Sequence, residues 1–321
     1  MSKRYPTTAS VLFERGPPVG SVRDTPVRMY DSLGKTAIKP EHISSWDDFT
    51  FANLWPAFQC IFIWPPSNSP APPRSPIPPY TINSANDVRE MTKHHLDDLL
   101  ERTAGDGARV ILSRVGRSLS PSNIIIDSCR RLPAAGDLIY VPRLSVSLGN
   151  KQDGGRPWLV VGSARVSKTW HSSSLSQEKP SSSDLIPLHQ LACYARFSNT
   201  PYAFIASDRE VIVVRYFRVS ENDPDQFGAE WKAIPWSVAG DQVLTGNLAI
   251  WCLIMMALND NHRSVNFRDE TLPINLWYRE ESNGVVHFRN HFSLRTLDTL
   301  PTNAKVVATP GGPSDQNRMM F

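Results

Sequence analysis

The run Trp158 to Gly162 (WLVVG) constrains the fold more than any other stretch, because it is apolar at every position. A strand with one face in water alternates apolar and polar residues, whereas a strand buried on both faces is apolar throughout. Such a strand needs a neighbour on each side and helices over both faces of its sheet. The run therefore predicts a central strand in a mixed α/β domain whose sheet is flanked by helices.

The segments around this run supply the other elements of such a domain. After Ser84, a predicted N-cap, apolar residues recur at helical spacing up to Leu100. His94 and His95 in that helix are adjacent and point in different directions, so we interpret them as solvent-facing and core-edge residues rather than metal ligands. The remaining predictions up to residue 200 are strands at 108–114, 123–127 and 137–146, a disordered serine-rich loop at 171–184, and a helix from Asp184 or Pro187. Beyond residue 200 the predicted elements are a hairpin of 202–206 with 211–219, a short edge strand at 229–235, a buried helix from Thr245 to Leu258, and a hairpin turning at Asn283-Gly284.

Composition divides the chain into three parts. Prolines concentrate in the N-terminal quarter, so residues 1–82 are predicted to be a flexible arm that contains an aromatic segment (46–64) and a proline-rich spacer (65–80). The aromatic segment is interpreted as packing on the main body, with partner docking as the alternative. The folded domain is predicted over 83–295, and 296–321 is predicted to be a disordered tail.

Charge and apolar patterning bound the class of protein. The net charge of +3 permits a polyanionic partner without requiring one. The four cysteines are scattered and form no Cys-x-x-Cys pair, which favours a reducing compartment. The start lacks an apolar signal core, and the longest apolar run, Leu248 to Leu258, is too short to span a bilayer. We therefore expect a cytoplasmic or nuclear protein with no membrane partner. A serine hydrolase elbow and a phosphate-binding glycine loop are both missing from the sequence.

Polar side chains gather at the ends of the elements around the buried run. Asp137 stands in a strand that reads GDLIYVP, Ser163 and Arg165 close the WLVVG strand, and Gln190 lies early in the next helix. Strand ends and the start of the following helix meet at one edge of a sheet, so we expect Asp137, Arg165 and Gln190 to lie together. Hydrolysis of a phosphodiester at such an edge needs carboxylates that hold a metal ion and a nearby lysine.

Read with these residues, the chain resembles the restriction-endonuclease-like superfamily, whose signature is PD-(D/E)XK. The resemblance covers roughly Ser84 to Leu258: Asp137 looks like the first-strand aspartate, and Ser163-Ala164-Arg165 stands where acid-x-lysine is expected. Gln190-x-x-x-Tyr194 is similar to the glutamine–tyrosine motif of the exonuclease branch. The chain also resembles a group of filamentous-fungal proteins with such a core, which share a W-x-x-IPW segment like Trp231 to Trp236 here.

The departures from the signature decide which function is expected. Ser163 cannot carry the negative charge that a Mg²⁺ ligand needs, and Arg165 cannot be deprotonated as a lysine can. The resemblance therefore implies a degenerate, catalytically impaired nuclease fold that keeps a nucleic-acid-binding or scaffolding role, with Arg165 and Lys168 as phosphate contacts. If the chain is active, Mg²⁺ is the implied cofactor, Asp137 is a metal ligand, and the second acid comes from elsewhere. The substitute acids considered are Glu90, Asp127 and Glu178.

Other interpretations stay open at this point. The chain is alternatively an active metal-dependent DNA or RNA nuclease with a rearranged acidic site, or a protein-interaction module that uses the 46–80 segment. For single residues, Asp137 is alternatively a turn-closing residue, and Arg165 and Lys168 a solvated strand end. Gln190 and Tyr194 are alternatively helix-boundary residues. Trp231 and Trp236 are interpreted as core residues rather than as a platform on which bases stack.

Overall fold

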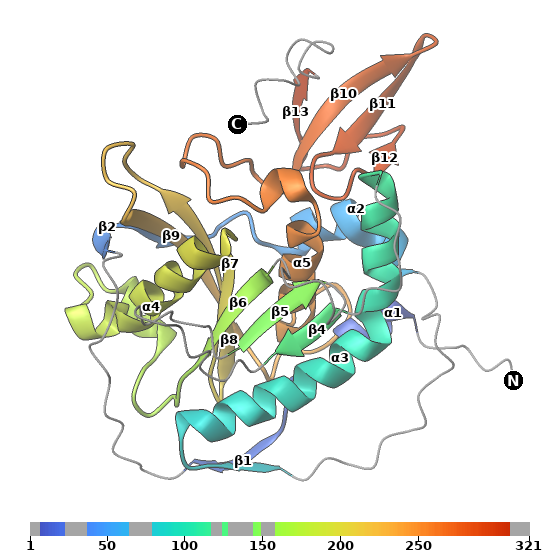
Figure 1. The fold of residues 1–321 in the computed structure, drawn as a ribbon. Helices are drawn as coiled ribbons and strands as arrows, with labels where there is room; N and C mark the ends of the chain where they lie inside the picture. Colours follow the sequence, from blue (N-terminus) through green and yellow to red (C-terminus); the bar gives the residue numbers. More distant parts are fainter. Residues whose placement is uncertain are drawn as a thin grey trace, which may run out of the picture.

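The computed structural model describes residues 7–22, 37–63, 79–116, 124–127, 144–148 and 158–308. A seven-stranded mixed sheet in the order β2-β9-β8-β7-β6-β5-β4 forms its centre (Figure 1). The predicted central strand is β6, whose neighbours are β5, antiparallel, and β7, parallel. The strands of this sheet are β2 (Ala37–Ser45), β4 (Ile124–Asp127), β5 (Leu144–Leu148), β6 (Trp158–Ala164), β7 (Tyr202–Ala206), β8 (Glu210–Arg218) and β9 (Gln226–Pro235).

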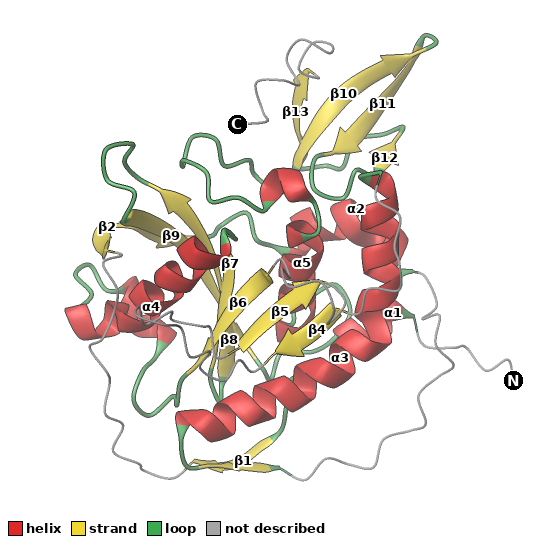
Figure 2. Cartoon of the chain, in the orientation of Figure 1, coloured by secondary structure: helices red, strands yellow, loops and turns green. Residues whose placement is uncertain are grey.

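Helices cover both faces of the sheet, as the apolar run predicted (Figure 2). The larger hydrophobic cluster joins one face to four helices, and the smaller cluster joins the other face to α4 and to Trp170 and Leu175, which precede it. Side chains alternate between the two clusters along β7 and β8, so both strands are buried on both faces. The helices are α1 (Thr8–Leu12), α2 (Phe51–Phe62), α3 (Ala85–Arg114), α4 (Ser182–Ser198) and α5 (Gly246–Ala257).

The predicted caps begin two of these helices. Ser84 accepts a hydrogen bond from the backbone N–H of Asp87, and Thr245 accepts one from Leu248. All twelve residues of α5 are buried, as its continuous apolar sequence predicted.

The strand predicted at 108–114 is wrong, because this segment is the last part of α3. Ala108, Ile111 and Leu112 are buried at helical spacing, and Gly107 allows α3 to approach α5 closely. A Cβ atom at Gly107 would lie 2.7 Å from Met255 Sδ and 2.8 Å from the Trp251 ring. Gly107 therefore serves the packing of α3 against α5.

The serine-rich segment 171–184 is ordered, so the predicted disordered loop is wrong there. It contains a short 3₁₀ helix, η1 (Ser172–Ser176), with Leu175 buried. A capping box of Ser181 and Asp184 then begins α4 at Ser182, a few residues earlier than predicted. The indole of Trp170 donates to the Asp184 carbonyl at 2.9 Å and ties the two ends of the segment together.

The strand predicted as a short edge at 229–235 lies inside the sheet. β9 is ten residues long and pairs with β8 on one side and, in parallel, with β2 on the other. β2 comes from the segment predicted to be a flexible arm, so the described parts of residues 1–82 fold with the domain. Two short strands of that segment, β1 (Val19–Val22) and β3 (Tyr80–Ile82), pair with each other.

The aromatic segment packs on the main body, as interpreted from its composition. Trp46, Phe49, Phe58 and Phe62 are each at most 1% exposed. This burial removes their rings as a surface for partner docking. The proline-rich spacer falls outside the described residues up to position 78.

A second, four-stranded sheet follows α5 and projects from the body (Figure 1). The predicted turn at Asn283-Gly284 is confirmed, with φ angles of 53° and 76°. Part of the predicted disordered tail is ordered, because the last strand pairs in parallel with the first. The strands are β10 (Leu276–Ser282), β11 (Val285–Asn290), β12 (Thr296–Leu297) and β13 (Lys305–Ala308), preceded by the 3₁₀ helix η2 (Asp260–His262).

In the part of the chain that the structure describes, no helix has the length and apolar character to cross a bilayer.

Candidate functional site

The carboxyl end of β6 carries the first predicted site residues. Residues Val161, Ser163 and Arg165 alternate onto the face of the sheet that α4 covers. Ser163 is 4% exposed, so its hydroxyl lies beneath the surface, whereas the Arg165 side chain is half-buried at the strand end. Asp137, the expected metal ligand, lies outside the described residues.

Two of the three side chains expected to meet do so. The Arg165 guanidinium donates to Oε1 of Gln190 at 2.5 Å and to the Ala164 carbonyl at 2.9 Å. The amide of Gln190 in turn donates to the hydroxyl of Tyr194, one helical turn later, at 2.9 Å. The chain of contacts from Arg165 to Tyr194 joins the end of β6 to α4, and it confirms that these residues share one edge of the sheet.

A buried acid that the sequence reasoning missed supports this strand end. Asp208 is 5% exposed and follows β7 after one intervening residue, Ser207, so it lies beside the end of β6. Its carboxylate accepts hydrogen bonds from the Ser167 backbone N–H at 2.6 Å and the Ser167 hydroxyl at 2.5 Å. These contacts fix the turn on which Lys168 is exposed to solvent. An acid just beyond a fully apolar strand, after a single serine, was the signal available in the sequence.

The described residues do not supply a metal centre at this edge. No group of three or more His, Cys, Asp or Glu side chains within them has the geometry to hold a metal ion. Of the substitute acids, Glu90 forms an ion pair with Arg89 at 3.1 Å, and Glu178 is exposed after η1. The side chain of Asp127 lies outside the part that the structure describes. Ser163 offers a neutral oxygen, which is a poor ligand for Mg²⁺.

Residues interpreted as structural are found in structural positions. Trp236 is 4% exposed and its indole donates to the Ser207 carbonyl at 2.8 Å, while Trp231 packs partly buried against the smaller hydrophobic cluster. His94 is exposed and bonds to the Tyr80 hydroxyl, and His95 bonds to Asn247 of α5 at 2.7 Å.

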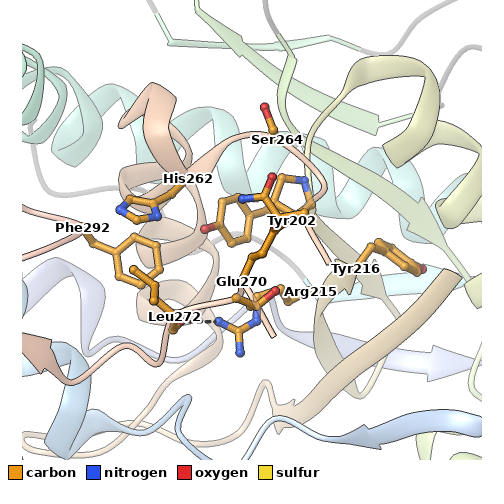
Figure 3. Close-up of a pocket in the computed structure, with 11 residues that line it drawn as sticks. Tyr202, Arg215, Tyr216, His262, Ser264, Glu270, Leu272 and Phe292 are labelled. Carbon is orange, nitrogen blue, oxygen red and sulfur yellow. Dashed lines mark hydrogen bonds between the residues drawn. The ribbon is translucent and has the colours of Figure 1, made fainter. Parts of the chain in front are cut away.

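A second polar cluster, also missed from the sequence, surrounds Arg215 at the opposite end of the sheet (Figure 3). Arg215 is 6% exposed, and its Nε and one terminal nitrogen donate to Glu230 at 2.9 and 2.5 Å. Its other terminal nitrogen donates to the Leu272 carbonyl at 3.0 Å. The adjoining cavity of about 30 Å³ has room for little more than water. These contacts assign Arg215 to the core rather than to a ligand.

Two histidines beside this cavity are held neutral. Burial lowers the pKa of His262 to about 4, and burial together with the neighbouring His262 holds the pKa of His291 well below its usual value. His291 Nε2 lies 2.8 Å from the Pro273 carbonyl, to which it donates, and His262 Nε2 lies 3.0 Å from the His291 carbonyl. The pair therefore joins η2 to the end of β11 through neutral rings.

The edge formed by β6 and α4 is thus a described site with the chemistry to bind an oxyanion. A planar guanidinium suits the geometry of a phosphate, and Gln190 fixes the position of that guanidinium. Comparisons of the sequence and the structure with protein-family models, curated proteins and solved structures gave no match.

Proposed function

We propose that this chain is a nuclease-fold protein of restriction-endonuclease-like type that has lost efficient catalysis and binds nucleic acid at the edge formed by β6 and α4. The observation that carries the proposal is the contact between Arg165 and Gln190. It brings together two of the positions through which the chain resembles the superfamily. Arg165, with the exposed Lys168 nearby in sequence, is the proposed contact to backbone phosphates.

The order of the elements supports this proposal. The resemblance requires that the strand carrying the first acid lie beside the strand that ends in the acid-x-lysine triplet, with the glutamine–tyrosine helix next. β5, which covers the end of the strand predicted from Asp137, pairs with β6, and α4 follows β6. The mixed sheet flanked by helices is observed, whereas its assignment to the restriction-endonuclease-like type is part of the proposal.

The side chains at the triplet support impaired catalysis. A nuclease of this type needs a charged oxygen at the position of Ser163 and an amine at that of Arg165. A buried hydroxyl and a guanidinium that bonds to Gln190 meet neither need.

Replacing Arg165 by glutamine tests the proposed contact. We expect the affinity for a short DNA duplex, measured by fluorescence anisotropy at low salt, to fall about three- to tenfold, because one phosphate contact is lost. The slope of log affinity against log salt should decrease by about one for the same reason. Arg165→Lys keeps the charge without the planar fork and should lose less affinity.

Arg279→Gln is the matched control, because Arg279 lies on β10 of the projecting sheet and pairs there with Glu281. Equal losses for Arg165→Gln and Arg279→Gln would indicate general charge attraction and contradict the site. Undetectable binding of both DNA and RNA by the unmodified protein would overturn the proposed function. Mg²⁺-dependent cleavage that disappears in Asp137→Ala would replace it with an active nuclease.

A further inference from the structure

An open hollow of about 420 Å³ lies where the end of β8 meets β2 and the loop that follows η2. It does not overlap the edge formed by β6 and α4. Arg218 ends β8, which runs antiparallel to β7, whereas Arg165 follows the end of β6, which is parallel to β7. The two arginines therefore belong to opposite ends of the sheet. The hollow is lined by His42, Phe217, Arg218, Val219, Phe267, Arg268 and Asp269.

Two Phe-Arg pairs face each other across this hollow and stack reciprocally. The guanidinium carbon of Arg218 lies 4.7 Å from the centre of the Phe267 ring, and that of Arg268 lies 5.1 Å from the centre of the Phe217 ring. The backbone fixes this arrangement, because Arg218 N–H donates to the Asn266 carbonyl at 2.8 Å and a parallel bridge joins Arg218 to Phe267. Each ring therefore holds the arginine of the other pair.

Gly228 leaves open the space that the Phe217 ring occupies. The two residues are cross-strand partners, and a Cβ atom at Gly228 would lie 2.2 Å from the Phe217 ring and 2.9 Å from the His42 carbonyl. The ring fills the space that a side chain would occupy on β9, and it is 2% exposed. Its position, and with it that of the Arg268 guanidinium, is set by the sheet.

The charges of the hollow suit an anion. In the described part of the chain, no carboxylate lies within ion-pair distance of Arg218 or Arg268, although Asp269 is one of the lining residues. A guanidinium stacked on a ring keeps N–H groups at its edge, and those groups match the oxygens of a phosphate. One terminal nitrogen of Arg268 also donates to the Ser44 hydroxyl at 3.5 Å. His42 of β2 also lines the hollow. Because the guanidinium groups lie over the two rings, the rings orient the arginines rather than offer a platform for a base.

We propose that this hollow binds a phosphate-bearing ligand through Arg218 and Arg268. Two arginines on opposite walls favour two linked phosphate groups over one, since each guanidinium can take a separate group in a bidentate contact. The proposal does not depend on nucleic-acid binding by the edge formed by β6 and α4.

Titration of the full chain with pyrophosphate, followed by isothermal calorimetry at low salt, tests the site. We expect saturable binding, weakened about tenfold or more by Arg218→Gln or by Arg268→Gln, because each removes one bidentate contact. Arg268 is exposed, so its replacement leaves the fold intact even if Arg218→Gln disturbs the loop. Inorganic phosphate should bind more weakly than pyrophosphate.

Arg279→Gln is a control of equal charge, and it should leave pyrophosphate binding unchanged. The site would be overturned by equal losses in Arg279→Gln and in Arg268→Gln, or by pyrophosphate that does not bind the unmodified protein at millimolar concentration. Adenosine diphosphate and adenosine serve as further probes. Binding of the diphosphate but not of the nucleoside is expected, and equal binding of the two would contradict recognition of phosphate.

Discussion

Arg215→Met is expected to lower the free energy of unfolding by about 3–5 kcal/mol, because it leaves the Glu230 carboxylate partly buried without its cation. The guanidinium of Arg215 also lies 4.7 Å from the centre of the Trp46 ring and bonds to the Leu272 carbonyl. The change therefore removes contacts to three separate parts of the chain. Urea unfolding followed by tryptophan fluorescence and circular dichroism measures the loss.

The double variant Arg215→Met with Glu230→Leu separates the cost of an unpaired charge from the loss of packing. Replacing both members of a buried ion pair by apolar residues of similar size often leaves stability nearly unchanged. We therefore expect the double variant to recover most of the lost free energy. A double variant that is less stable than Arg215→Met would contradict the proposed cost of an unpaired Glu230 carboxylate.

Acidification is expected to destabilise the junction between η2 and β11. The pKa of His262 is lowered from 6.5 to about 4 in the folded state. Between these two pH values the unfolded chain therefore binds more protons than the folded chain. The stability linked to this residue is present above pH 6.5 and is lost as the pH falls toward 4. A shift of this size corresponds to a loss of about 2 kcal/mol between pH 7 and pH 5 from His262 alone. His291, whose pKa is also lowered, acts in the same direction.

Urea unfolding at a series of pH values measures this dependence. His262→Gln keeps an N–H donor toward the His291 carbonyl and removes the titrating ring, so it should flatten the curve between pH 7 and pH 5. His287→Gln on β11 is the control, because His287 lies at the surface and contacts Asp298. An unchanged curve in a variant with both His262 and His291 replaced by glutamine would contradict this assignment.

Local patterns predicted the elements whose sequence signal is self-contained. The apolar run of β6, the cap and apolar run of α5, and the Asn283-Gly284 turn each follow from a few neighbouring residues. The errors arose where partners distant in sequence decide the structure. The segment 108–114 was predicted to be a strand, but it continues α3, whose Gly107 lies against Met255 and Trp251 of α5.

The candidate site was predictable only in part for the same reason. The contact between Arg165 and Gln190 was expected from a strand end and the helix that follows it, although Gln190 lies in the middle of α4 rather than at its start. Asp208 lies more than forty residues from Ser167, and its role depends on the parallel pairing of β6 and β7. His262 and His291, and likewise Arg218 and Phe267, meet through long-range packing that no local pattern encodes.

The pairing of β2 with β9 has a consequence for the order of events during synthesis. About 190 residues separate Ala37 from its partner Gln226, so β2 has no strand to pair with until most of the protein has been translated. On the ribosome the apolar side chains around β2 stay without their partner strand until β9 has been synthesised. During this interval the nascent chain is most exposed to chaperones and to self-association.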